Sequence, residues 1–145
     1  MCFDIFSKLY DEVLQSQYDI VFCDKKWIEN SQNQRANIFL YSDNKVLHVN
    51  EIKNEMEKRF RDPISNVGIF GLTGRLIKRS IITKNNIFFD ENLRYLEDET
   101  FSWQILSRVK NIKYLKLQLY DYNVNPNINS ALSEGLSKDY PISNF

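Results

Sequence analysis

Apolar residues recur at intervals of three and four over residues 2–17, with charged residues between them. This spacing predicts an amphipathic helix. Residues 18–23 form a short apolar and β-branched run, typical of a strand covered on both faces, and Asp24, Lys25 and Lys26 end it. A helix that leads directly into a buried strand is the second half of a βαβ unit. We therefore expect a parallel strand to precede this chain.

The middle of the chain predicts a hairpin and a second helix. Residues 27–37 are polar and indicate irregular structure, whereas 38–42 and 45–49 read as two short strands around Asp43 and Asn44. Asn50 can cap a helix that ends near residue 60. One face of that helix carries an apolar stripe, made of Ile52, Met56 and Phe60.

The remaining elements complete a mixed α/β pattern. Three of the four glycines precede a basic segment with Arg75, Lys78 and Arg79, and Ser80 can cap a short helix. Residues 87–91 read as a brief strand or a buried turn. Residues 97–110 predict a helix, and 112–117 and 119–124 predict two strands. The polar residues that follow predict a tail. The helix over 97–110 has a core stripe of Phe101, Ile105 and Val109, and Asp98 falls on the same stripe.

Composition excludes several classes of protein. The 145 residues carry 19 Lys and Arg against 19 Asp and Glu, so no net charge favours nucleic acid. No apolar run approaches the roughly 20 residues that cross a bilayer, and the N-terminus is not a secretory signal. Cys2 and Cys23 lack the spacing of a zinc site or a disulfide framework. We expect a cytoplasmic protein, and peripheral attachment to the inner membrane face stays open.

Three segments could carry chemistry, and each has a structural alternative. Glu97, Asp98 and Glu99 open a helix, where acidic side chains are common because they stabilise the helix dipole. Asp98 differs from its neighbours because its stripe faces the interior, so it is a candidate proton acceptor. We expect it to point into a cleft that another polypeptide segment completes.

The other two segments give weaker signals. Gly74 and Arg75 lie in a glycine-rich, basic stretch that is either a weak phosphate cradle or a tight turn before a solvated strand. Tyr122 and Asn123 lie where a strand runs into an Asn-rich loop, which is either a sheet edge or a hydroxyl-binding lip. The single histidine, His48, lacks neighbouring ligands and reads as structural, which leaves no Ser-His-Asp triad.

These segments, in this order, resemble the C-terminal half of bacterial family 2 glycosyltransferases with the GT-A fold. The resemblance covers about residues 3–130, and the remaining residues 131–145 form the polar tail. It is carried by FSKLYDEVLQSQYDIVFCD, by GLTGRLIKRSIITKNNIFFDENLRYLEDETFSWQIL and by IKYLKLQLYDYNVNPNINS. The block from FDENL to EDETF is the specific part.

The resemblance implies inverting transfer of a sugar from a nucleotide-sugar donor to a hydroxyl of a surface-glycan acceptor, such as a capsule or lipooligosaccharide. It implies Asp98 as the base and Glu97 as its support. It also implies substrate contacts from the basic strand, with Arg75 ahead of Lys78, and from Gly74, Tyr122 and Asn123.

The family's nucleotide-binding half and its metal-binding DxD motif have no counterpart here. Mn²⁺ or Mg²⁺ is therefore expected of a complete enzyme, and this chain alone supports no metal site. A fragment, a split enzyme completed by a partner chain, and an inactive remnant all stay open. The alternative function is a non-catalytic assembly module that pairs with a donor-binding chain.

Overall fold

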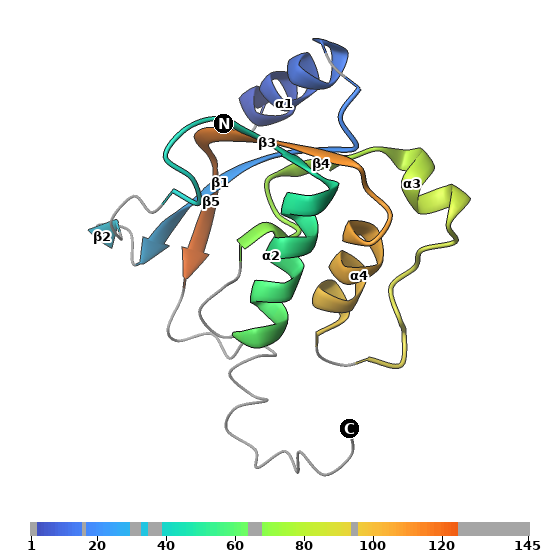
Figure 1. The fold of residues 1–145 in the computed structure, drawn as a ribbon. Coiled ribbons are helices and arrows are strands. Elements are labelled where there is room, and N and C mark those ends of the chain that lie inside the picture. The colour runs from blue at the N-terminus through green and yellow to red at the C-terminus, as the bar shows by residue number, and fades with distance from the viewer. Residues whose placement is uncertain are drawn as a thin grey trace, which may run out of the picture.

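The computed structural model describes residues 3–15, 17–29, 33–34, 39–63, 68–93 and 96–124. Helices and strands alternate along these ranges (Figure 1). The helical elements are α1 (Phe3–Gln15), α2 (Val49–Arg61), the 3₁₀ turn η1 (Gly68–Phe70), α3 (Arg79–Lys84) and α4 (Glu97–Leu106). The strands are β1 (Ile20–Glu29), β2 (Asn33–Gln34), β3 (Lys45–His48), β4 (Arg75–Ile77) and β5 (Asn111–Val124).

Within the described ranges the strands form one five-stranded sheet around the parallel pair β1 and β5. The order is β2-β1-β5-β3, and β4 pairs with β1 on the same side as β2. β3 runs antiparallel to β5, and β4 runs antiparallel to β1. The sheet is thus mixed, as the sequence predicts. The carboxyl ends of its two long parallel strands meet at one edge, which is where open α/β sheets usually bind ligands.

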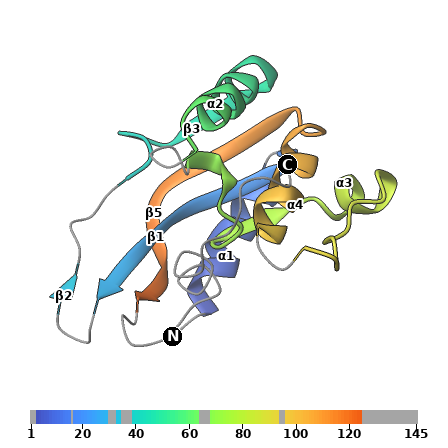
Figure 2. The same ribbon diagram turned by 90° about the horizontal axis from the view of Figure 1, so that it is seen from below.

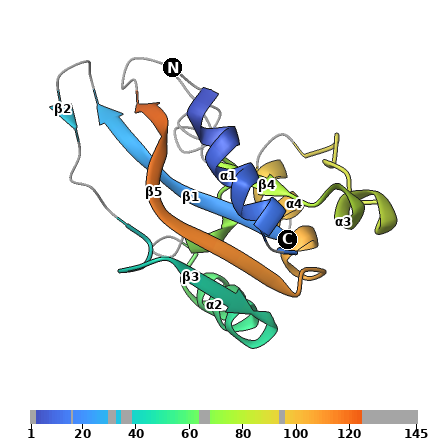
Figure 3. The ribbon, with the colours of Figure 1, turned by 90° about the horizontal axis from the view of Figure 1, so that it is seen from above.

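Helices cover the two faces of the sheet unequally. Figures 2 and 3 show α1 on one face, and α2 and α4 on the other. The core under α1 is small and contains Ile5, Leu9, Val21, Cys23 and Leu115. The core on the other face is larger and includes Phe22, Leu47, Ile52, Ile105 and Tyr114. Val21 and Cys23 therefore face α1, whereas Phe22 between them faces α2 and α4, as the strand period requires.

Several predicted boundaries are wrong. The predicted strand over 18–23 continues to Glu29, and the two predicted strands after residue 112 are one strand, β5. The reason is that β1 and β5 pair along nearly their whole length, with irregular register on either side of Asp24. The predicted hairpin is absent from the described residues, because β3 pairs with β5 instead and residues 39–44 are not a strand.

The predicted helices are largely confirmed. α1, α2 and α4 lie where the apolar periodicity places them, although α2 begins at Val49 and α4 ends at Leu106. Phe60, predicted on the apolar stripe of α2, is 81% exposed because the core ends before the last turn. No helix in the described ranges is long and apolar enough to cross a bilayer. The predicted tail lies outside the described residues.

Candidate active site at the start of α4

The first turn of α4 begins at a residue in an unusual backbone conformation. Leu96 is the N-cap and has φ 61°, in the left-handed region that non-glycine residues rarely adopt. Its carbonyl accepts hydrogen bonds from the backbone N of Thr100 at 2.9 Å and from Thr100 Oγ1 at 3.0 Å. Glu97, Asp98 and Glu99 follow Leu96, so three carboxylates occupy the positive end of the helix dipole.

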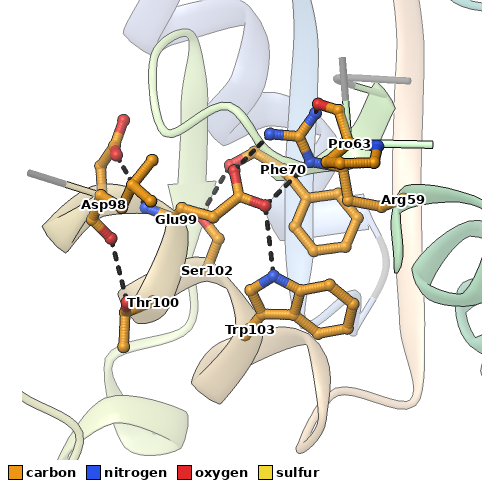
Figure 4. A network of polar contacts seen from close by, with 9 residues as sticks. Arg59, Pro63, Phe70, Asp98, Glu99, Thr100, Ser102 and Trp103 are labelled. Atoms are coloured by element: carbon orange, nitrogen blue, oxygen red, sulfur yellow. Dashed lines mark hydrogen bonds and ion pairs between the residues drawn. The ribbon is translucent and has the colours of Figure 1, made fainter. Parts of the chain in front are cut away.

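Glu99 fixes this turn against α2. Arg59 donates from Nε to Oε1 of Glu99 and from Nη2 to Oε2, both at 2.8 Å (Figure 4). Trp103, one turn further along α4, donates from Nε1 to the same Oε1 at 3.2 Å. The hydrogen bonds that Arg59 donates to Glu99 raise the pKa of Arg59. A bidentate pair between a guanidinium and a carboxylate fixes the relative orientation of the two side chains and also neutralises their charges. The pair therefore fixes the start of α4 against α2.

Apolar and backbone contacts support the same junction. Phe70 of η1 packs against Trp103 with the ring centroids 4.8 Å apart, and the Arg59 guanidinium lies 5.9 Å from the Phe70 ring centroid. The buried Ser102 donates from Oγ to the carbonyl of Phe70 at 2.6 Å. The start of α4 is therefore held by α2 and η1 together.

Asp98 does not point into the interior, which corrects the prediction from its stripe. Its side chain is exposed, and its Oδ1 accepts a hydrogen bond from the backbone N of Glu99 at 2.7 Å. The stripe itself is right, because Phe101 and Ile105 on it are buried. The first turn of α4 extends past the edge of the core, so the inward-facing position there meets solvent. In Figure 4 the Asp98 carboxylate lies on the opposite side of Glu99 from Arg59.

The sequence predicts a cleft beside Asp98. None of the main hollows on the described surface is lined by Asp98. One hollow of about 720 Å³ lies on the α1 side of the molecule, between Lys8, Asn44 and Lys116, and Asp98 does not line it. Glu97 is exposed like Asp98. The described residues thus hold the two acids at an open edge.

Arg75, the basic residue that the sequence favours for substrate contact, is held inside the sheet edge. It begins β4 opposite Phe22 of β1, and its guanidinium lies 5.3 Å from the Phe22 ring centroid. Nη1 donates to the carbonyl of Ile69 at 3.0 Å. Burial lowers the pKa of Arg75 to about 10, so the side chain still carries its positive charge at neutral pH. Gly74 precedes it with φ 69°, and a Cβ there would lie 3.3 Å from the carbonyl oxygen of Cys23.

Lys25 and Tyr122 come together near Arg75. The Lys25 Nζ lies 4.5 Å from the ring centroid of Tyr122, across the β1–β5 pair. Burial lowers the pKa of Lys25, the positive charge of Arg75 lowers it further, and the negative charge of Asp98 opposes both. Lys25 is therefore within electrostatic reach of both Arg75 and Asp98. It lies toward the carboxyl ends of the parallel strands.

Lys78 is not brought to this group. It caps α3 near the amino end of β1, and its Nζ lies 4.0 Å from Oδ1 of Asp19. Asn123 pairs through its backbone with Ile28, but its side chain lies outside the described residues. The structure thus brings Lys25 onto Tyr122, with Arg75 and Asp98 within electrostatic range of Lys25, and leaves Lys78 apart.

The described residues offer no cluster of three or more His, Cys, Asp or Glu side chains that could hold a metal ion. The carboxylate of Asp24, next to Lys25 in β1, accepts a hydrogen bond from the Tyr114 hydroxyl. Burial raises the pKa of Asp24, and the hydrogen bonds from Tyr114 and from the backbone of Leu40 oppose that rise.

Comparison with known proteins gives one sequence match and a consistent set of folds. The chain is 29% identical to the uncharacterized glycosyltransferase EpsJ of Bacillus subtilis strain 168, over 143 residues that cover 94% of this chain and 40% of EpsJ. It is similar to glycosyltransferases. No family model matches the chain.

Solved structures show the same kind of fold. The S. aureus TarS 1–349 structure in complex with UDP superposes with a TM-score of 0.57 at 14% identity, over 83% of this chain and 32% of TarS. TarS 1–349 in complex with UDP-GlcNAc superposes with a TM-score of 0.58 at 13% identity, over 85% of this chain and 31% of TarS. The glycosyltransferase-like chain therefore spans well under half the length of the proteins it resembles.

The site predicted from the sequence omits Arg59 and the partners of Glu99. The sequence places Lys25 at the end of a strand, because a lysine after an apolar run usually marks solvent. The Glu99 and Trp103 pair could have been found, since residues four apart share a helix face. The Arg59 partner could not, because it lies 40 residues away on another helix.

Proposed function

We propose that this chain is the acceptor-side part of an inverting glycosyltransferase. In this proposal Asp98 is the general base, and the substrates are a nucleotide-sugar and a hydroxyl of a bacterial surface glycan. The proposal is supported most by one observation. An exposed carboxylate, Asp98, stands at a helix start that Arg59 and Glu99 hold in place, within electrostatic reach of Lys25 of β1.

The chemistry needs one carboxylate on the acceptor side. The acceptor oxygen forms a bond to the anomeric carbon while the bond from that carbon to the nucleoside diphosphate breaks. Asp98 takes the proton of the attacking hydroxyl, and the diphosphate leaves with the electron pair of the broken bond. A single displacement of this kind inverts the anomeric centre. Solvent exposure suits Asp98 for this role, because the hydroxyl must reach it from outside the core.

Several residues of the chain would serve that step. The Arg59 and Glu99 pair would keep the first turn of α4 in place, so that Asp98 keeps its position while substrate binds. Glu97 would support Asp98 or orient the acceptor. Tyr122 would offer an exposed aromatic face beside Lys25. Mn²⁺ or Mg²⁺ belongs to the proposal for the completed enzyme, with its ligands in the donor-binding segment.

A chimera tests this function. In the chimera this chain would replace the matching 40% of EpsJ, and EpsJ would supply the remaining 60% of its own length. The purified chimera would be given a panel of UDP-sugars, including UDP-GlcNAc, with Mn²⁺ and bacterial glycan extracts. We expect nucleoside diphosphate release that depends on the extract, and a product whose anomeric configuration is opposite to that of the donor by NMR. A product that retains the donor configuration would contradict the inverting mechanism.

A second candidate function is a non-catalytic assembly module that pairs with a donor-binding chain. One observation favours it. Phe6, Tyr10 and Leu14 are exposed along one face of α1 at four-residue spacing, while Ile5 and Leu9 on the other face are buried. An exposed apolar stripe of this kind marks an interaction surface. A chimera that folds but transfers no sugar from any donor in the panel would support the assembly module over the enzyme.

A further inference from the structure

Arg75 is a part-buried cation whose charge no described carboxylate balances. Its Nε atom is buried with no hydrogen-bond partner among them. None of their carboxylates lies within 4.0 Å of its guanidinium nitrogens. Among the described residues, the carbonyl of Ile69 and the ring of Phe22 are the groups that contact the guanidinium. A guanidinium in such a position gains most from a bidentate oxyanion.

Lys25 adds a second positive charge to the same region. It is close enough to Arg75 for the two charges to affect each other, and it lies over the Tyr122 ring. Two positive charges within electrostatic range repel each other, and the negative charge of Asp98 opposes this effect at Lys25. An anion bound between them would remove the repulsion.

The backbone beside Arg75 leaves room for a ligand. Gly71 lies next to the guanidinium, and a Cβ on it would come within 4.0 Å of Arg75 Nη2. Gly74 is not open in this way, because a Cβ on it would lie 3.3 Å from the carbonyl oxygen of Cys23. The open side at Gly71 would let a ligand approach Arg75 Nη2 closely.

We propose that Lys25 and Arg75 together bind a phosphate group of the substrate. Phosphate fits better than carboxylate because it carries up to two negative charges and offers three acceptor oxygens, which two separate cations can share. The role of this phosphate in sugar transfer rests on the proposed function, but its binding does not. The phosphate could belong to the leaving nucleoside diphosphate or to a phosphate ester on the acceptor.

A purely structural role for Arg75 makes a different prediction. Through its hydrogen bond to Ile69, the guanidinium would only fasten η1 to the sheet. Arg75 variants would then lower the free energy of unfolding and leave phosphate binding unchanged wherever the protein stays folded. Lys25 variants would have no effect on phosphate at all.

The test measures binding of inorganic phosphate, methyl phosphate, UDP and acetate to the full chain, by calorimetry or NMR titration at constant ionic strength. We expect phosphate compounds to bind and acetate to bind more weakly. Lys25→Gln and Arg75→Lys should each weaken phosphate binding by about tenfold or more. Lys26→Gln, which removes a charge from the next residue of β1, is the matched control and should change it little.

The titrations separate the possible results. Stronger binding of UDP than of methyl phosphate, lost in both variants, would assign the site to the leaving diphosphate. Equal binding of the two would assign it to a phosphate on the acceptor. If Arg75→Lys does not fold, Lys25→Gln alone decides. Phosphate affinity that is equal in Lys25→Gln, Lys26→Gln and the unaltered chain would overturn the proposal, whether or not the chimera transfers sugar.

Discussion

Arg59 and Glu99 are joined by two hydrogen bonds of 2.8 Å, which tie the last turns of α2 to the first turn of α4. Their side chains are only 12% and 21% exposed. Pairs at this depth are costly to break from one side, because the remaining charge is left without its partner. The pair therefore positions the residues around it as well as stabilising the fold.

Removing one member of this pair should destabilise the chain measurably. We expect Glu99→Gln to lower the free energy of unfolding by about 1–3 kcal/mol, measured by urea denaturation. The double variant Arg59→Met with Glu99→Leu should lose less than the sum of the two single variants, since neither charge is left alone. Additive losses across that cycle would show that the two side chains act independently.

Gly74 should be sensitive to a methyl group and Gly71 should not. Gly74 has φ 69° and its added Cβ would contact the Cys23 carbonyl, so Gly74→Ala should cost about 1–2 kcal/mol of stability. Gly71→Ala is the matched control, because its Cβ meets only the end of a side chain at 4.0 Å. Equal urea midpoints for the two variants would show that the backbone at Gly74 is not strained by a side chain.

We expect the left-handed backbone conformation of Leu96 to destabilise the folded chain. A leucine in the left-handed region costs roughly 1–2 kcal/mol, part of which glycine returns through its larger unfolded-state entropy. We expect Leu96→Gly to raise the unfolding free energy by roughly 0.5–1 kcal/mol. Leu96→Ala removes the exposed side chain and keeps the strain, so thermal melts should show no comparable gain. A loss of stability in Leu96→Gly would indicate that the leucine side chain makes contacts that matter more.

The raised pKa of Asp24 predicts that this residue makes a pH-dependent contribution to stability. Burial holds its pKa above the ordinary value of 3.8, so the folded protein binds the proton more tightly than the unfolded chain. The contribution of Asp24 is complete below the unfolded pKa and is lost as pH rises through the folded pKa. The unfolding free energy of the natural chain relative to Asp24→Asn should therefore fall as the pH rises above the ordinary value of 3.8. Urea titrations of both proteins check this, and a difference that grows with pH would contradict it.

Local patterns predicted much of the fold, and long-range pairing explains most of the errors. The periodicity around Ile52 and Ile105 gave correct helices, because an apolar stripe depends only on neighbours along the chain. The length of β1 did not follow from its polar second half. Residues such as Lys25 and Lys26 belong to the strand because β5 pairs with them, and β5 lies about 90 residues away.

The candidate site shows the same division. The local sequence indicates Asp98 and Arg75 only as candidates, and its prediction that Asp98 faces the interior is wrong, because periodicity gives the direction of a side chain and not where the core ends. The proximity of Lys25 to Arg75 depends on the pairing of β1 with β4, which no local pattern specifies.

Asp98 gives the most direct test, because its side chain is exposed and can be changed without disturbing the core. The measurement is the rate of sugar transfer by the EpsJ chimera carrying Asp98→Asn, with Glu97→Gln as the neighbouring control. We expect Asp98→Asn to lower transfer by about a hundredfold or more while the urea midpoint stays unchanged, and Glu97→Gln to lower it much less. Transfer by Asp98→Asn at the rate of the unaltered chimera would contradict the assignment of Asp98 as the base.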